Sequence, residues 1–481
     1  MLNLRPIFFA IGLMLAILSA TMILPALVDL ADANSDWRAF LAAAVFTFFV
    51  GGLLVLMTFD DRQIELSVKD AFLLTTLSWV MLCAFAALPF IGVGISYTDA
   101  FFETMSGLTT TGSTVLTGLD SLPRGVLLWR ALLNGIGGIG IIVMALLILP
   151  YLRVGGMQLF RAESSDKSEK IVPRALELVS ATAGVYVGLL VLCAVVYALL
   201  GMSIFDAICH SMATLATGGF STHDLSFKFF QSPAIEWSGT FFMALGALPF
   251  VVLIQAMSGG PRALWRDEQV RGFIGFLIVV TLILAMWYSM TRGVPLTDAV
   301  RLSAFNVTSI VTTTGFVSDD YTQWGTFAIG LFFLLTFVGG CSGSTAGAIK
   351  IYRLQVAGLL TRRHFTHLIS PNRIVTLSYN GRRLPDDVPF SVVAFLAIYM
   401  ATVGIFTVLL TGMGLDLTTS LSSAAQALGN VGPGFGDIVG PSGNFATLPA
   451  PAKWVLALAM LLGRLELFTV LVLFRPEFWR S

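Results

Sequence analysis

The chain has 481 residues, of which 56% are hydrophobic and only 12% are charged. Soluble domains carry about 25% charged residues, so this composition excludes an ordinary soluble protein and indicates a membrane protein. The formal net charge is zero, which gives no indication of nucleic-acid binding. Four cysteines lie in apolar segments without metal-ligand spacing, and we expect them to be small buried hydrophobic residues: Cys83, Cys193, Cys209 and Cys341.

Ten stretches of the chain are apolar enough for a transmembrane helix, which needs roughly 20 residues. They lie at about 5–28, 38–58, 70–94, 124–151, 174–200, 234–257, 273–292, 324–358, 389–412 and 450–474. The first resembles a signal peptide because Arg5 precedes an apolar run. The run from Pro6 to Val28 is nevertheless long enough to span, and further spans follow, so we predict a retained first helix.

Four shorter segments between these stretches are too short or too polar to cross a membrane. They lie at about 98–110, 204–216, 298–313 and 417–430, and each opens near an aspartate: Asp99, Asp206, Asp298 and Asp416. Aspartate at a helix start accepts bonds from free backbone N–H groups and suits the positive end of the helix dipole. We therefore expect four half-helices.

Each half-helix ends in a glycine turn. The turns are Thr109-Thr110-Thr111-Gly112-Ser113, Ala216-Thr217-Gly218-Gly219, Thr312-Thr313-Thr314-Gly315 and Gly429-Asn430-Val431-Gly432. We match Gly112, Gly218, Gly315 and Gly432, which lie 106, 97 and 117 residues apart. Self-similarity at this spacing predicts four related units of helix, half-helix, glycine turn and helix.

The predicted fold is an all-α membrane protein with ten transmembrane helices. It consists of two extra N-terminal transmembrane helices (1–68) and four helix–pore-loop–helix repeats around a central pore: 69–152, 153–262, 263–385 with an intramembrane gate loop, and 386–481. Non-helical backbone at membrane depth is tolerated only if it is buried in protein or lines a watery cavity. Four such breaks therefore indicate re-entrant loops, although one turn alone could be an ordinary connection.

These turns suit the chemistry of an ion selectivity filter. A bare K⁺ ion needs oxygen atoms to replace its water, and several backbone carbonyl groups aimed at one point supply them. Glycine permits the required backbone rotation because it tolerates positive φ. The half-helix points its partly negative C-terminal end at the ion. Thr111, Thr217 and Thr314 add candidate side-chain oxygens, with Val431 as the exception.

The distribution of basic residues predicts the orientation. The stretch 350–383 holds seven Lys or Arg residues and no acid, and 153–174 also has an excess of bases. Acidic residues lie in loops on the other side, as Asp29, Asp32, Asp36, Asp319 and Asp320. The positive-inside rule then places both termini in the cytoplasm and all four turns outside, with the slightly acidic loop 59–70 as a weak contrary sign.

Several runs resemble the TrkH/KtrB/HKT superfamily of K⁺ and Na⁺ transport proteins. They are Asp206-Ala207 through Ser221-Thr222, Thr312 to Gly315, Asn430-Val431-Gly432-Pro433-Gly434 and Gly463-Arg464-Leu465-Glu466. The similarity covers essentially the whole chain, and the two extra N-terminal spans make TrkH the closest branch. The resemblance implies a K⁺ filter formed by Thr110, Thr111, Gly112, Thr217, Gly218, Thr313, Thr314, Gly315, Asn430, Val431 and Gly432.

The same resemblance implies ion preference, partners and location. Serine at the first filter position accompanies Na⁺ permeation in plant relatives, so four glycines favour K⁺, with Rb⁺. K⁺ would be the transported ion, and no organic cofactor is expected in this chain. A homodimer with one pore per protomer and a cytoplasmic TrkA-like nucleotide-binding regulatory ring are implied. The protein would lie in membrane lipid, in the bacterial cytoplasmic (inner) membrane, and bind no nucleic acid.

Two features fit a gate below the filter. The stretch 339–347 is rich in glycine, which weakens a helix by up to about 1 kcal/mol per residue. In the family it is an intramembrane loop closing the pore, here with Gly340, Gly343 and Gly347, and the alternative is close helix packing through small residues. Arg464 lies mid-span, where a charge costs at least about 2.5 kcal/mol. We expect it to face the pore as an electrostatic barrier, and the alternative is a structural bond to a distant carboxylate or carbonyl.

Other signals carry less weight. The G-x-G-x-x-G match at 135–140 lies inside an apolar span, so helix packing explains it better than nucleotide binding. We read Glu103 as a buttress of the first loop, with negative potential at the pore entrance as the alternative. His210 is predicted to be a hydrogen-bonded structural residue, and Arg130, Asn134 and Asn306 to be packing or network residues. No catalytic cluster is evident, so an enzyme is not expected.

Three functions remain to be distinguished. The leading hypothesis is a gated, K⁺-selective conduit for potassium uptake. The second is an H⁺- or Na⁺-coupled K⁺ symporter, which usually needs a protonatable group at the membrane midplane, and Glu466 is the main candidate. The third is a membrane scaffold or sensor that transports nothing.

Overall fold

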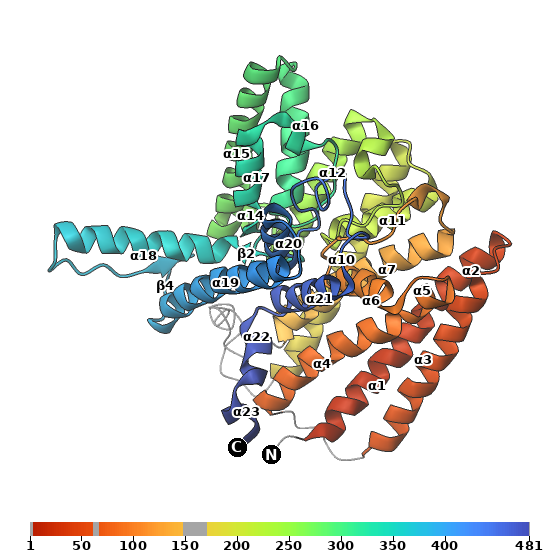
Figure 1. The fold of residues 1–481 in the computed structure, drawn as a ribbon. Helices are drawn as coiled ribbons and strands as arrows, with labels where there is room; N and C mark the ends of the chain where they lie inside the picture. The colour runs from red at the N-terminus through yellow and green to blue at the C-terminus, as the bar shows by residue number, and fades with distance from the viewer. Residues whose placement is uncertain (1–2, 61–66, 148–170, 481) are drawn as a thin grey trace.

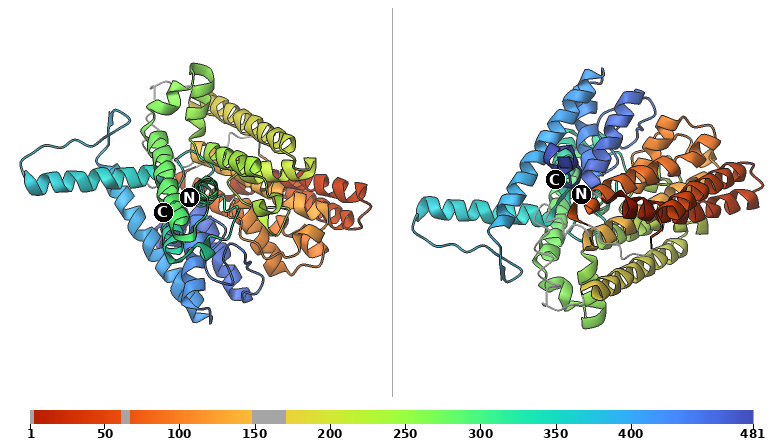
Figure 2. Two further views of the ribbon diagram at one scale, coloured as in Figure 1. Left: turned by 90° about the horizontal axis from the view of Figure 1, so that it is seen from above. Right: turned by 90° about the horizontal axis from the view of Figure 1, so that it is seen from below.

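The computed structural model describes residues 3–60, 67–147 and 171–480. Three helices form the N-terminal part: α1 (Leu4–Thr21), α2 (Ile23–Ala31) and α3 (Trp37–Thr58). Gly12 and Gly51 let α1 and α3 approach closely, because a Cβ on Gly12 would lie 2.8 Å from the Gly51 carbonyl oxygen. Small residues are the usual means of close helix packing in membranes, so this pair forms a tight hairpin beside the rest of the molecule (Figures 1 and 2).

The remaining described helices surround the centre of the molecule. Those of the first two predicted repeats are α4 (Val68–Ala86), α5 (Leu88–Gly92), α6 (Tyr97–Leu108), η1 (Leu119–Ser121), α7 (Arg124–Leu147), α10 (Ile171–Leu199), α11 (Ile204–Leu215), η2 (Ser226–Phe230), α12 (Pro233–Gly246) and α13 (Phe250–Gly259). Those of the last two are α14 (Arg262–Arg266), α15 (Glu268–Arg292), α16 (Leu296–Val311), η3 (Tyr321–Trp324), α17 (Thr326–Leu335), α18 (Ile351–Ile369), α19 (Asp387–Gly412), α20 (Leu417–Gly429), α21 (Ala450–Arg464), α22 (Phe468–Leu471), η4 (Val472–Phe474) and α23 (Pro476–Arg480).

Two small sheets complete the described secondary structure. β1 (Val338–Gly339) and β2 (Ile349–Lys350) pair in parallel, with Val338 opposite Ile349. β3 (Ser378–Tyr379) and β4 (Arg382–Arg383) form a short antiparallel hairpin beyond α18. The prediction of an all-α membrane protein is confirmed. Seven of the described helices are long and apolar enough to cross a membrane, and two bent pairs pass the same test together.

The four predicted half-helices are present as α6, α11, α16 and α20. Three start at a side-chain cap: the hydroxyl groups of Ser96 and Ser203 accept bonds from Asp99 N and Asp206 N, and the Asp416 carboxylate accepts one from Thr419 N. The predicted opening aspartate is thus the cap itself only in α20. In α6 and α11 it lies three residues after a serine cap.

Three predicted spans are interrupted. The stretch 234–257 bends by 100° between α12 and α13, and 450–474 bends by 108° between α21 and α22. At the first bend, Pro249 lies directly before α13. At the second bend, between α21 and α22, Glu466 and Leu467 have positive φ. The stretch 324–358 is helical from Thr326 to Leu335 and again from Ile351, where α18 begins and projects away from the body (Figure 1). Apolar composition does not register the first two bends, whereas the glycine-rich run 339–347 predicted a break in the third stretch, where a loop lies between β1 and β2.

Candidate functional site

The four turns share one backbone conformation. Each contains a residue with left-handed φ that is not glycine, namely Thr110 (51°), Thr217 (50°), Thr313 (57°) and Asn430 (53°). Two positions later each has a glycine with positive φ, namely Gly112 (88°), Gly219 (70°), Gly315 (82°) and Gly432 (106°). Since side chains disfavour the left-handed region, its repetition at four sites indicates one shared structural requirement.

Hydrogen bonds give the same alignment of the turns. In each turn, the backbone N–H of the residue between the left-handed residue and the glycine donates to a carbonyl oxygen five residues earlier. That carbonyl belongs to the half-helix of the same unit, and we call the four half-helices α6, α11, α16 and α20 the pore helices from here on. The pairs are Thr111 N to Ser106 O (2.8 Å), Gly218 N to Ala213 O (2.8 Å), Thr314 N to Ser309 O (2.8 Å) and Val431 N to Gln426 O (3.0 Å). Gly218 is therefore the counterpart of Thr111, Thr314 and Val431.

The counterpart of Gly112 in the second turn is accordingly Gly219, and the predicted match with Gly218 is corrected by one residue. Gly218 has no side chain because Asn134 of α7 fills that place. A Cβ on Gly218 would lie 2.5 Å from the Asn134 side-chain carbon. The Asn134 amide donates to Gly107 O (2.9 Å) and accepts from Phe220 N (3.2 Å), so it ties the first two units together.

The four turns interlock as a closed ring. A Cβ on each aligned glycine would lie less than 3.0 Å from a carbonyl oxygen of another turn, a separation that real Cβ atoms essentially never show. These contacts join Gly112 to Gly218 O, Gly219 to Thr314 O, Gly315 to Val431 O and Gly432 to Thr111 O. The order follows the chain, and the fourth turn closes on the first. Side chains are thereby excluded where the turns meet.

The hydroxyl groups of Thr111 and Thr314 bond to neighbouring protein groups, whereas Thr110 Oγ1 has no hydrogen-bond partner among the described residues. Thr111 Oγ1 lies 2.7 Å from Thr109 Oγ1 and accepts from Asn430 Nδ2 (2.9 Å). Thr314 Oγ1 lies 2.7 Å from Thr312 Oγ1. These side chains hold the turns in shape. The backbone carbonyl groups are consequently the better candidates for ion contact.

A buried ion pair supports the first turn. Glu103 and Arg130 are essentially unexposed, and Arg130 Nε donates to Glu103 at 2.8 Å. The Glu103 carboxylate also accepts from Val115 N and Thr114 Oγ1, each at 2.9 Å. Arg130 Nη1 donates to Ser221 O (2.7 Å) in the next unit. Glu103 thus has the contacts of the expected buttress.

A loop lies against the pore-helix ends and connects β1 to β2. Its Gly347 N donates to Thr313 Oγ1 (2.7 Å), and Ala348 N donates to Gly429 O (2.9 Å). Thr345 Oγ1 bonds to Leu215 O at 3.0 Å. This loop contains the predicted gate glycines. A Cβ on Gly340 would lie 2.7 Å from the Ala346 Cβ, one on Gly347 would meet Gly429 O at 2.5 Å, and Gly343 has φ 77°.

Arg464 ends α21 beside this loop. Its side chain is buried, and Nη1 donates to Thr345 O at 2.8 Å. Within the described residues, Nε and Nη2 have no hydrogen-bond partner. Glu466 turns away and pairs with Arg353 of α18. Arg464 therefore lies next to the loop, as expected of a barrier, and also makes the carbonyl bond that was the alternative.

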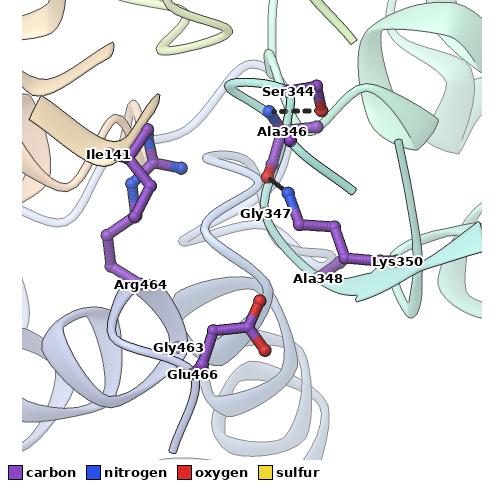
Figure 3. Close-up of a pocket in the computed structure, with 10 residues that line it drawn as sticks. Ile141, Ser344, Ala346, Gly347, Ala348, Lys350, Gly463, Arg464 and Glu466 are labelled. Carbon is purple, nitrogen blue, oxygen red and sulfur yellow. Dashed lines mark hydrogen bonds between the residues drawn. The ribbon is translucent and has the colours of Figure 1, made fainter. Parts of the chain in front are cut away.

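Arg464, Lys350 and Glu466 line a small cavity together with the loop (Figure 3). Lys350 Nζ donates to Ala346 O. Lys350 and Arg353 are both buried, although they open the basic stretch that was interpreted as an orientation signal or as a docking site for an acidic or nucleotide-bearing partner. Their position directly after the glycine-rich run was the available clue. Three buried cations with one carboxylate give this region a positive charge excess.

Comparisons with known proteins agree over the whole chain. The TrkH family model, described as a cation transport protein, matches residues 37–481. The Trk system potassium uptake protein TrkI of Halomonas elongata is 45% identical, over 99% of this chain and 97% of its own length. TrkH of Escherichia coli K12 is 38% identical over 100% of both chains. The crystal structure of the potassium transporter TrkH from Vibrio parahaemolyticus superposes with a TM-score of 0.91 at 36% identity, over 100% of both chains. This chain therefore belongs to the TrkH family of cation transport proteins.

Proposed function

We propose that this protein takes up potassium across the cytoplasmic membrane through a gated, channel-like pore. The observation that carries the proposal is the closed ring of four turns, in which glycine meets carbonyl at every junction. Four repeats, at 69–152, 153–262, 263–385 and 386–481, each contribute one turn, and residues 1–68 stand outside. The names of the relatives, which are potassium uptake proteins, support K⁺ as the ion.

The filter acts through backbone carbonyl groups. Those of Thr111, Gly218, Thr314 and Val431 form its strict layer, and the aligned glycines Gly112, Gly219, Gly315 and Gly432 give the backbone the freedom to present them. Thr110, Thr217, Thr313 and Asn430 continue it toward the pore helices. The dipoles of α6, α11, α16 and α20 end at this ring and favour a cation there. The aligned glycine is the only residue that all four turns share. We therefore expect selection for K⁺ to be less stringent than in channels whose filter is built from four identical and longer segments.

The gate is the loop 340–348 together with Arg464. The loop bonds to the ends of three pore helices, and the guanidinium group adds a positive charge beside it. A cation leaving the filter must pass a region with excess positive charge, which is an electrostatic barrier. Opening would move the loop and Arg464 together because one hydrogen bond joins them.

Regulation and assembly follow from the family. We infer a homodimer with one pore per protomer, and a cytoplasmic nucleotide-binding ring of the TrkA kind as partner. We infer that both termini lie in the cytoplasm; the start of α1 and helix α23 lie close together at one end of the molecule (Figure 1). The exposed Arg362 and the half-buried Arg363 of α18, on the same predicted side, offer a docking surface to an acidic or nucleotide-bearing partner.

The experiment is a current measurement on purified protein in a planar bilayer. Discrete unitary currents that reverse at the K⁺ equilibrium potential support the conduit. A reversal potential that shifts with the pH or Na⁺ gradient would instead establish coupled transport. The pairing of Glu466 with Arg353 weighs against a free proton carrier, so we expect no such shift.

A further inference from the structure

One position repeats in all four pore helices, nine residues before the aligned glycine of each turn. With Gly219 as the counterpart of Gly112, this position holds Glu103, His210, Asn306 and Ser423. All four side chains are fully buried. The match is hidden when Gly218 is used in the alignment, because the second member then becomes Cys209.

Two of these side chains, those of the first and third units, bind the segment that leaves the turn. Glu103 accepts from Val115 N (2.9 Å), three residues past its glycine. Asn306 contacts Ser318, also three residues past its glycine, by donating to Oγ (2.9 Å) and accepting from N (3.4 Å). A carboxylate and an amide therefore make the same link from the same position.

His210 makes the corresponding link in the second unit. Its Nδ1 lies 2.9 Å from Asp206 O, and a carbonyl oxygen can only accept, so Nδ1 carries the proton. Nε2 then accepts from Ser221 Oγ at 2.9 Å. Ser221 lies two residues past Gly219, as Thr114, which also bonds to Glu103, lies two past Gly112.

The fourth unit lacks this link. The Ser423 hydroxyl has no hydrogen-bond partner among the described residues. The segment after Gly432 is held differently, by Ser422 Oγ donating to Phe435 O at 3.1 Å. Ser113 of the first turn also donates to Gly432 O at 3.0 Å. Ser423 therefore shows the same helix position without the link that Glu103, His210 and Asn306 make, and a substitution there can serve as a control.

We propose that Glu103, His210 and Asn306 are positioning residues that determine the ion selectivity of the filter. None of them contacts a carbonyl oxygen of the ring. Each fixes the chain immediately beyond the aligned glycine, so each sets how far that strand, and the carbonyl group before it, can move. Selectivity depends on the number and placement of coordinating carbonyl groups, so a looser strand accepts a smaller ion more readily. This inference rests on the proposed filter.

The second unit offers a matched pair of variants. In His210→Gln the terminal amide reaches the place of Nε2 and keeps the contact with Ser221. In His210→Asn the shorter side chain reaches only the place of Nδ1 and loses it. Ser221→Ala removes the same bond from the other side, and Ser423→Ala is the control, because its hydroxyl has no partner.

The measurement is the K⁺/Na⁺ permeability ratio from reversal potentials of purified variants in bilayers, with thermal stability recorded in parallel. We expect His210→Asn and Ser221→Ala to lower the ratio by about tenfold, the factor that corresponds to one lost buried hydrogen bond. His210→Gln and Ser423→Ala should stay within about twofold of the parent ratio. Should His210→Asn fail to fold, Ser221→Ala alone decides.

The proposal is overturned if His210→Asn or Ser221→Ala lowers thermal stability but leaves the K⁺/Na⁺ permeability ratio unchanged. That result would show that the bond stabilises the fold and does not affect selectivity. Gly112→Ser, measured beside them, separates this failure from failure of the filter. If Gly112→Ser changes the ratio and the two bond-breaking variants do not, only the positioning role is wrong. If none of the three changes it, the turns are not the filter.

Discussion

The ring of turns and the loop beside it differ in how they are constructed. The ring uses four segments with the same backbone conformation, and its contacts are between neutral main-chain groups. The loop 340–348 belongs to a single unit, and the cavity next to it is lined by charged side chains. In the described part of the chain we find no counterpart of this loop in another unit. In the proposed function, ion selection belongs to the symmetric ring and control of passage to the asymmetric loop.

The largest effect on K⁺ uptake should come from a substitution at Gly219 in the ring of turns. Alanine there would place a Cβ against the Thr314 carbonyl oxygen, at a backbone φ of 70°. We expect K⁺ or Rb⁺ uptake by cells lacking other K⁺ uptake systems to fall by about 100-fold, equivalent to about 2.7 kcal/mol of lost stabilisation. Gly94→Ala is the control, since Gly94 has φ 92° but open space around it, and its uptake should stay near the parent level. Parent-like uptake by Gly219→Ala would remove the second turn from the ring.

The asymmetric loop should respond in the opposite direction. Arg464→Ala removes both the charge and the bond to Thr345 O, and deleting part of 339–347 removes the loop itself. We expect basal K⁺ flux into proteoliposomes to rise by about tenfold, which corresponds to about 1.4 kcal/mol off the barrier. Arg464→Lys keeps the positive charge, so its basal K⁺ flux should rise less than that of Arg464→Ala. If neither Arg464→Ala nor the deletion increases flux, the gate is elsewhere.

A smaller change within the ring should alter selection without abolishing transport. At Gly112 the added Cβ would lie 2.6 Å from Gly218 O, so Gly112→Ser displaces one junction of the four. We expect the K⁺/Na⁺ permeability ratio to fall severalfold, about 1 kcal/mol of discrimination. Reversal potentials under opposed K⁺ and Na⁺ gradients measure it. An unchanged ratio would argue against this turn lining the filter.

The smallest effect concerns the loops beyond the ring, where His223 joins the first two units. Burial lowers the pKa of His223, but hydrogen bonds and charges of Asp206 and Asp120 outweigh it and raise that pKa above its usual value. Nδ1 lies 2.5 Å from Asp120 Oδ1. The stabilisation should be complete below the ordinary histidine pKa and vanish as pH rises through the raised one. It should be worth less than about 1 kcal/mol, because Asp120 is half exposed.

Thermal unfolding of the parent and of His223→Gln across this pH range tests that linkage. The difference in stability between the two proteins should be greatest at acidic pH and should fall at alkaline pH to the part that stacking on Phe229 contributes. A constant difference at all pH values would mean that the charge of His223 contributes nothing. The histidine would then act only through its stacking on Phe229, whose ring centroid is 3.5 Å away.

The half-helices and turns of the site could be predicted from the sequence, but the residue-by-residue match between the four turns could not. Half-helices and turns follow from local properties, namely length, capping residues and glycine, and these were predicted. The register of the second turn depends on a side chain from another helix. Gly218 and Gly219 are both glycines that follow a threonine in the sequence, and the structure separates them by the positive φ of Gly219, the bond from Gly218 N to Ala213 O and the position of Asn134 behind Gly218. No pattern within residues 216–219 carries that information.

Lys350 and Arg353 were missed as buried residues beside the cavity for a related reason, whereas Arg464 and Glu466 had been singled out from the sequence. Lys350 and Arg353 are part of a basic stretch that serves as a topology signal, and a charge count does not separate buried members from exposed ones. Their burial follows from the path of the chain after Leu335, which turns back through the parallel pairing of β1 and β2 instead of continuing as a helix. Such a path is set by contacts with the second and fourth units, such as Cys341 N to Ala247 O and Ala348 N to Gly429 O.

The contact between Gly432 and Thr111 has a consequence for biosynthesis. The chain is made from its N-terminus, so the first three turns can enter the membrane while the fourth is still unmade. Until residue 432 arrives, the first turn faces a gap where its neighbour belongs, and the sequence of glycine-to-carbonyl junctions is open. If the ring is the filter that we propose, selectivity is acquired in one step, with the last unit, and a chain that stops before the fourth turn lacks two of the four junctions.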